Sequence, residues 1–220
     1  TGTGFLDGNL ALSIPSGTTT YITYPLGHYD GANDEYTPVQ IKMNGTGGTA
    51  GLLNIRADDT HPGGGVGITP IDRSYYVKIP NGSSFDRGSR LYNIIMHFVA
   101  SDVIGNPSEY VIKMNISSWE FLSLGTRTST SAEAVNINQF KSIGNEAIFC
   151  LGPPAAIVYY SIADDVWDNP NTWSLEDYGG NPAPDYPHEG DSVRIGDGYT
   201  VTMNTDYVID NGNAVVVETA

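Results

Sequence analysis

The sequence predicts an all-β protein: a β-sandwich of immunoglobulin-like or jelly-roll type, followed by the start of a β-helix-like module. Apolar and polar residues alternate with a period of two in many short runs, as in strands that bury one face. Turn-forming groups of Gly, Asn and Pro separate these runs. Apolar residues at helical spacing are scarce, and the one helical candidate is a weak pattern at 132–140.

Composition narrows the classes of protein and partner. The chain has 220 residues, 40% of them hydrophobic, which is enough to build a core for one or two domains. Its formal net charge is -15 with only ten Lys and Arg, so we expect no nucleic-acid binding and no attraction to anionic membranes. No apolar run reaches the roughly 20 residues that cross a bilayer, so we expect no membrane insertion. A divalent cation or a neutral polysaccharide suits this charge better.

The single cysteine indicates the compartment. Cys150 has no partner in the chain for a disulfide or for a cysteine-based zinc site. Low cysteine and low lysine suit an exported bacterial protein. The first residues lack the basic start and apolar segment of a signal peptide. We therefore expect the chain to be a mature piece of a longer extracellular protein.

Seven runs predict the strands of a sandwich domain at 1–153. In the first run, Leu10, Leu12 and Ile14 share one face, with small or polar residues between them. The run at 91–99 is largely apolar on both faces, which indicates a central strand. The seven runs are 10–14, 39–43, 53–57, 75–79, 91–99, 110–114 and 147–151.

A second domain is predicted at 154–220, after a Gly-Pro-Pro sequence that stiffens the chain and removes two backbone donors. Short strand-like runs recur in its second half at a spacing of about seven residues. They lie at 193–195, 200–203, 207–209 and 214–217. Such even spacing is typical of the first rungs of a β-helix or of a small meander. Because four rungs bury little core, we expect them to stack on the sandwich or on further rungs.

Two ordered motifs in the second domain carry a family resemblance. One reads WDNPNTW from Trp167, and the other reads PHEGDSVRIGDGYTVTM from Pro187. The part at 159–210 resembles the eight-glycine module that opens right-handed β-helix regions in large secreted surface proteins of the Bacteroidetes. The part at 5–152 resembles the sandwich module that often precedes it. The matching pieces of that first part are Pro25-Leu26-Gly27, Tyr36-Thr37-Pro38-Val39, His61-Pro62 and 144–152.

The resemblance implies a location and a kind of partner. It implies export by type IX secretion into a multi-module adhesin or surface-layer protein on the bacterial cell surface. The partners would be other modules of the same polypeptide or neighbouring subunits. The resemblance brings no catalytic residues with it.

Aromatic residues near the first motif have two interpretations. Trp167, Trp173 and Tyr178 would suit a carbohydrate platform, because the C–H groups of a sugar ring pack flat on a π-face. Alternatively, the tryptophans bury the first rung of the β-helix, because indole is a large apolar group with one N–H to satisfy. We favour this capping interpretation over the platform.

Two acidic loops are candidates for calcium, which takes six to eight oxygen ligands. One loop carries Asp164, Asp165 and Asp168, and the other carries Asp30 and Asp34. Neither loop has the spacing of an EF-hand. Solvated surface carboxylates are the simpler interpretation, so Ca²⁺ is the one cofactor that stays open.

The expected function is a non-catalytic structural and adhesive module, whose edge strands can join neighbouring subunits into a filament or lattice. Two alternatives stay open: a carbohydrate-binding module, and the non-catalytic part of a β-helix enzyme that degrades polysaccharides. Asp58, Asp59 and His61 form an acid–base candidate beside the glycine-rich segment 63–67, and we interpret them as a loop. No nucleophile elbow, metal-binding helix motif or phosphate loop occurs in the sequence.

Overall fold

A computed structural model describes residues 4–17, 19–29, 34–60, 68–155, 157–187, 191–207 and 214–219. The chain divides into two compact units, Thr1–Pro154 and Ala155–Ala220. Apart from strands, the elements of the described residues are three short 3₁₀ helices: η1 (Ala100–Asp102), η2 (Pro107–Glu109) and η3 (Pro170–Thr172). In this described part, no helix is long and apolar enough to cross a membrane. The all-β prediction is confirmed.

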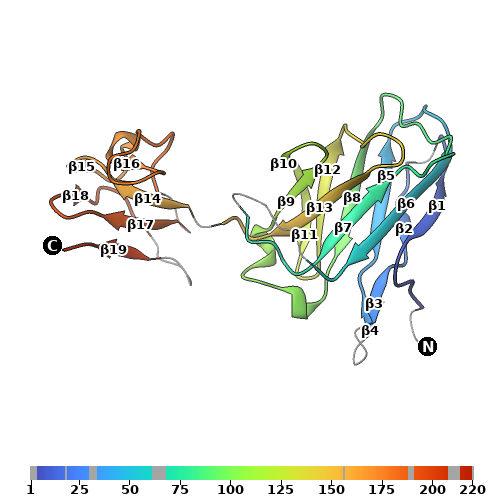
Figure 1. Ribbon diagram of the computed structural model, residues 1–220, viewed down its shortest axis with the longest axis horizontal. Coiled ribbons are helices and arrows are strands. Elements are labelled where there is room, and N and C mark those ends of the chain that lie inside the picture. Colours follow the sequence, from blue (N-terminus) through green and yellow to red (C-terminus); the bar gives the residue numbers. More distant parts are fainter. Residues whose placement is uncertain are drawn as a thin grey trace. The chain divides into compact units, whose positions relative to one another are not determined.

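The first unit is a sandwich of two antiparallel sheets (Figure 1). One sheet has six strands in the order β1-β6-β7-β13-β9-β10, and the other has five in the order β11-β12-β8-β5-β2. The six strands are β1 (Leu10–Ile14), β6 (Gly51–Asp58), β7 (Ser74–Lys78), β9 (Val111–Asn115), β10 (Trp119–Phe121) and β13 (Glu146–Gly152). The five strands are β2 (Ile22–Tyr24), β5 (Val39–Asn44), β8 (Leu91–His97), β11 (Leu124–Thr128) and β12 (Ser131–Ile137). A separate hairpin consists of β3 (Gly27–Tyr29) and β4 (Asp34–Tyr36).

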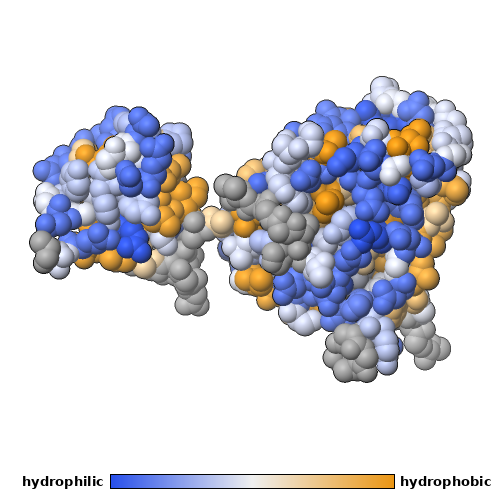
Figure 2. Space-filling view, viewed as in Figure 1, coloured by the Kyte–Doolittle hydropathy of each residue, from blue (hydrophilic) through white to orange (hydrophobic). Residues whose placement is uncertain are grey.

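Alternation along the strands decides which side chains fill the space between the sheets. On β6, Leu53, Ile55 and Ala57 are buried, whereas the residues between them are partly exposed. On the face seen in Figure 2, the surface of the sandwich is largely hydrophilic, with separate apolar patches. The alternation of buried and partly exposed residues along each strand is the reason that strands could be located from the sequence alone.

Buried tyrosines connect the two sheets by hydrogen bonds. The Tyr24 hydroxyl, on the five-stranded sheet, donates to the carbonyl oxygen of Leu53 at 3.0 Å. The Tyr75 hydroxyl, on the six-stranded sheet, donates to the carbonyl oxygen of His97. Burial raises the pKa of both phenols, so they remain protonated donors. Each bond satisfies a polar group that the core would otherwise leave unpaired.

The helix predicted at 132–140 is wrong, because most of this segment is strand β12. Ala132 and Ala134 are buried two positions apart, but the next buried residue is Ile137, three positions later. A register shift against β8 separates Ala134 from Ile137, and Asn136 adopts a positive φ of 57° there. This irregularity changes the spacing of buried residues from two to three, which imitates a helical pattern in the sequence.

The second unit is built on parallel strands. Its main sheet has the order β16-β14-β17-β19, in which β14, β17 and β19 run parallel. A second sheet pairs β15 with β18, also in parallel. The strands are β14 (Val158–Ser161), β15 (Asp165–Val166), β16 (Trp173–Ser174), β17 (Ser192–Ile195), β18 (Val201–Thr202) and β19 (Val215–Val217). Two parallel sheets that follow the chain in the same order are the arrangement of successive coils in a β-helix.

In the second unit, the strands that pair lie farther apart in the sequence than was expected. Strands about seven residues apart were expected to be neighbouring rungs, yet β17 pairs with β14 and β19, not with β18. Each coil therefore contains two short strands on different sheets. The run predicted at 207–209 lies largely outside the described residues.

Candidate functional site

The two tryptophans of the first motif form the core of the second unit. Trp167 is 1% exposed and Trp173 is fully buried, with their rings edge to face at 5.0 Å. Trp173 Nε1 donates to the carbonyl oxygen of Trp167 at 2.8 Å, and Trp167 Nε1 donates to that of Pro187 at 3.1 Å. Neither ring has a face for a sugar. The carbohydrate platform predicted at these two residues is therefore wrong, and both are buried as the capping interpretation requires.

Tyr178, the third predicted platform residue, is half-buried and packed edge-on. Its ring lies T-shaped against Tyr160 at 5.2 Å between centroids. On another side it covers Gly196, where an added Cβ would lie 2.8 Å from the ring. Desolvation and the nearby Glu218 carboxylate raise the pKa of the Tyr178 phenol. The ring thus contributes to packing of the sheet, and its predicted contact with a sugar stays a prediction.

Two of the three acidic residues predicted for calcium in the second unit join its coils by hydrogen bonds. Asp164 accepts a hydrogen bond from the Thr200 N–H at 2.6 Å, and Asp168 accepts one from the Asn204 side chain at 2.6 Å. Both bonds join the coil of β15 to the coil of β18. Asp165 accepts bonds from neighbouring groups of its own loop. Among the described residues, these three carboxylates do not form a cluster that could hold a metal.

The other predicted calcium loop is described only in part. Asp34 is exposed on β4, whereas Asp30 lies outside the described residues. The next residue, Glu35, belongs to a different group that the sequence did not reveal. One carboxylate oxygen from each of Glu35, Asp59 and Asp102 lies within 4.8 Å of the other two.

Arg73 lies among these three carboxylates and is fully buried. Its Nε donates to Asp102 Oδ2 at 2.6 Å, and its Nη2 donates to Asp102 Oδ1 at 3.2 Å. The same Nη2 donates to Glu35 and, at 3.3 Å, to Asp59 Oδ1. Asp102 is held in turn by the N–H of Val99 at 3.1 Å. Four separate segments of the sandwich supply this network.

The network has more negative than positive groups, since three carboxylates surround one guanidinium. Burial raises the pKa of Asp59, although the guanidinium of Arg73 opposes this effect. His28 lies 4.0 Å from Asp59 and 3.3 Å from Asp7, at the exposed side. Calcium would need these carboxylate oxygens as ligands, but Arg73 already bridges them. The arrangement is therefore an ion network around the buried Arg73, with Asp59 at its exposed end, and it joins the β3–β4 hairpin to the sandwich.

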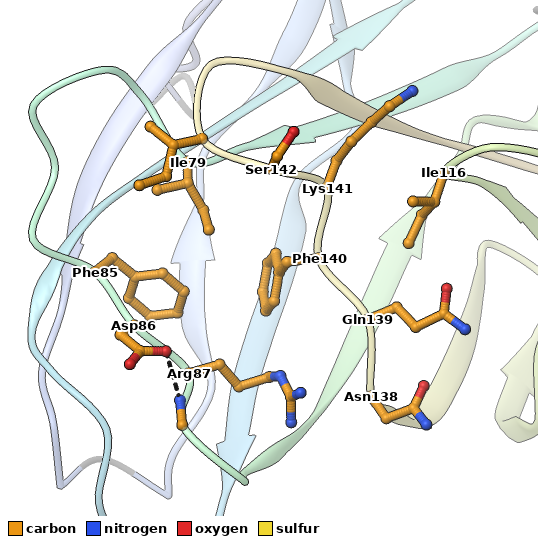
Figure 3. A pocket seen from close by; sticks show the side chains of 12 residues that line it. Ile79, Phe85, Asp86, Arg87, Ile116, Asn138, Gln139, Phe140, Lys141 and Ser142 are labelled. Carbon is orange, nitrogen blue, oxygen red and sulfur yellow. Dashed lines mark hydrogen bonds between the residues drawn. The ribbon is translucent and has the colours of Figure 1, made fainter.

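A pocket of about 550 Å³ lies elsewhere on the sandwich (Figure 3). Its lining comes from the loop before β8, the end of β9 and the loop between β12 and β13. The lining residues are Ile79, Phe85, Asp86, Arg87, Gly88, Ile116, Asn138, Gln139, Phe140, Lys141, Ser142 and Ile143. A second hollow of about 180 Å³ shares Asn138 and Gln139 with it. No local motif marks these residues, so sequence reasoning missed the pocket.

Comparison with known proteins found no protein family, no curated protein and no solved structure that matches the chain.

Proposed function

We propose that this chain is a non-catalytic structural and adhesive segment of a large secreted or cell-surface bacterial protein. In this proposal the sandwich is a rigid block. The second unit begins a stack of coils that other modules of the polypeptide, or neighbouring subunits, extend. Export by type IX secretion, which the resemblance of 159–210 implies, belongs to the same proposal.

The register of the parallel strands is the observation that carries the proposal. Tyr159, Val193 and Val215 occupy equivalent positions on β14, β17 and β19. All three pack in the core that contains Trp167 and Trp173. Each coil thus buries the apolar side chains of the coil before it, as in repeat structures that gain rigidity by stacking.

The last described strand has an edge that suits further stacking. Val215 and Val217 of β19 pair with β17 in parallel register, and the Glu218 N–H donates to the carbonyl oxygen of Ile195 at 2.9 Å. In a parallel pair, only every second residue of a strand forms backbone hydrogen bonds with a given neighbour. Glu218 is such a residue, so the backbone N–H and C=O groups of Val215 and Val217 point away from β17. Such an edge accepts another strand by β-augmentation.

Single-molecule force spectroscopy on the chain, pulled by its two ends, tests the structural role. We expect two discrete unfolding events, one for each compact unit. Val193→Asp places a charge in the stacked core and should abolish one event only. Val216→Asp is the matched control, because Val216 is exposed on the neighbouring strand, and it should retain both events.

Two results would contradict the proposal. One is extension of the second unit without a discrete event, since a structural stack must resist load. The other is release of reducing ends when the chain is incubated with a panel of polysaccharides, since that result would make it an enzyme.

A further inference from the structure

The pocket of Figure 3 carries positive charge in a strongly acidic chain, which has 25 Asp and Glu against ten Lys and Arg. Three other arginines are neutralised by ion pairs with carboxylates: Arg56, Arg73 and Arg194. Within the described part of the chain, Arg87 and Lys141 at the pocket form no ion pair. The one acidic lining residue, Asp86, accepts a hydrogen bond from the Gly88 N–H at 2.8 Å. The pocket therefore favours an anion.

The position of Arg87 is defined by a backbone contact. Its Nη1 donates to the carbonyl oxygen of Arg90, and Arg90 is itself buried and bonded to carbonyl oxygens. In Figure 3 the Arg87 guanidinium and the Lys141 side chain lie on opposite sides of the Phe140 ring. A planar guanidinium held in this way matches the two oxygens of a carboxylate or sulfate.

The rest of the lining suits a sugar ring. Phe85 and Ile79 are buried at the base, and Phe140 is half-buried. Phe140 stacks on Tyr92 at 4.3 Å between centroids and meets Phe85 edge to face at 5.5 Å, so its place is defined by the core. An apolar base offers contact to the C–H face of a sugar.

The amides of Asn138 and Gln139 stand on the side of the pocket, where sugar hydroxyls can donate to or accept from them. The same two residues also line the smaller hollow, so the two hollows are neighbours. The larger volume, about 550 Å³, lies within the range of about 300–1,000 Å³ that is usual for ligand sites.

We propose that this pocket binds one carboxylate-bearing or sulfate-bearing sugar residue of an anionic polysaccharide. Arg87 binds the anionic group, Phe140 packs against the ring, and Asn138 and Gln139 bind hydroxyls. Lys141, on the other side of Phe140, adds positive potential to the site. The inference goes beyond the proposed structural role, because it concerns only the sandwich and does not depend on the stacked coils. The net charge of -15 repels polyanions at long range, so retention by one requires a local site.

Affinity electrophoresis in calcium-free gels tests the proposal. The gels contain polygalacturonate for the carboxylate arm, dextran sulfate for the sulfate arm, or neutral dextran. We expect retardation in at least one anionic gel and none in dextran. The double variant Arg87→Gln/Lys141→Gln should lose affinity by about tenfold or more, because it removes the charge-assisted contact of Arg87 and the positive potential of Lys141. Lys42→Gln, which removes one charge from a residue outside the pocket, should bind as the original chain does.

A second variant tests the contact between the pocket and the sugar hydroxyls without a change of charge. Asn138→Ala removes one amide and should weaken binding while circular dichroism shows an unchanged fold. Absence of retardation in both anionic gels would overturn the proposal, as would an equal loss in Lys42→Gln. If the charge variants weaken binding but Asn138→Ala does not, the sugar assignment is overturned and the site is one for a bare anion.

Discussion

Replacement of Arg73 by Met should be among the most destabilising single changes in the sandwich. The side chain is fully buried and bonded to three carboxylates, and Met retains most of its apolar volume. Removal of one partner from a buried ion pair costs about 3–5 kcal/mol, because the remaining charge stays buried without compensation. Asp102 and Glu35 carry most of this cost, since their side chains are 5% and 15% exposed.

The loss should be visible in thermal and urea denaturation followed by circular dichroism. For a domain of this size each kcal/mol lowers Tm by about 2–4 °C, so we expect a fall of about 6–20 °C. Arg194→Met is the matched control, because its ion pair with Glu218 is exposed and screened by solvent, so its loss should change the Tm little. Asp102→Asn in the Arg73→Met background should recover part of the loss, because it removes one of the mutually repelling charges.

The pH dependence gives a sharper test of the cause. Loss of the guanidinium removes a charge that lowers the pKa of Asp59, which burial already raises, so the folded state should bind more protons than the unfolded state. The deficit should therefore shrink as the pH falls from about 7 toward about 4. Calcium chloride should also raise the Tm of Arg73→Met more than that of the original chain, because a divalent cation can replace the lost charge. A deficit below about 1 kcal/mol, or one independent of pH, would refute the reasoning, because a buried network must cost more than an exposed pair.

Three further outcomes are expected. Trp173→Ala should destabilise the second unit by about 3–5 kcal/mol and leave the sandwich transition in place, which two-stage urea unfolding would reveal. Burial raises the pKa of the Cys150 thiol to about 11, so Ellman's reagent at mildly alkaline pH should react with it only after unfolding. Burial opposes the ionised form of Glu133, but hydrogen bonds from Tyr21, Thr126 and Asn93 prevail and lower its pKa. Its contribution to stability should be present above pH 4.5 and lost as the pH falls through the lowered value, and Glu133→Gln should remove this dependence.

Much of the fold could be predicted because a strand that buries one face shows alternating apolar and polar residues in the sequence. The run at 10–14 coincides with β1, and those at 39–43 and 53–57 fall within β5 and β6. β12 escaped prediction because a register irregularity altered its spacing. Short strands such as β2 and β16 also escaped, since two or three residues are too few to show a period.

The candidate sites were less accessible to sequence reasoning. Asp164 and Asp168 were identified as an acidic loop, but their hydrogen bonds join coils 36 residues apart in the sequence. Arg73 was not singled out, because its carboxylate partners come from three distant segments. The pocket around Phe140 likewise depends on loops that meet only after the sheets have packed.

The sequence by itself determined the all-β class and the inward faces of the longer strands, and it favoured a buried role for the tryptophans. These properties follow from backbone geometry and side-chain polarity within a few residues. Only the tertiary structure decided that the second unit pairs its strands in parallel and that Arg73 binds three carboxylates. It also decided that Arg87 and Lys141 line one pocket. Each of these depends on which distant segments become neighbours, and that is settled by the packing of the whole unit rather than by any local pattern.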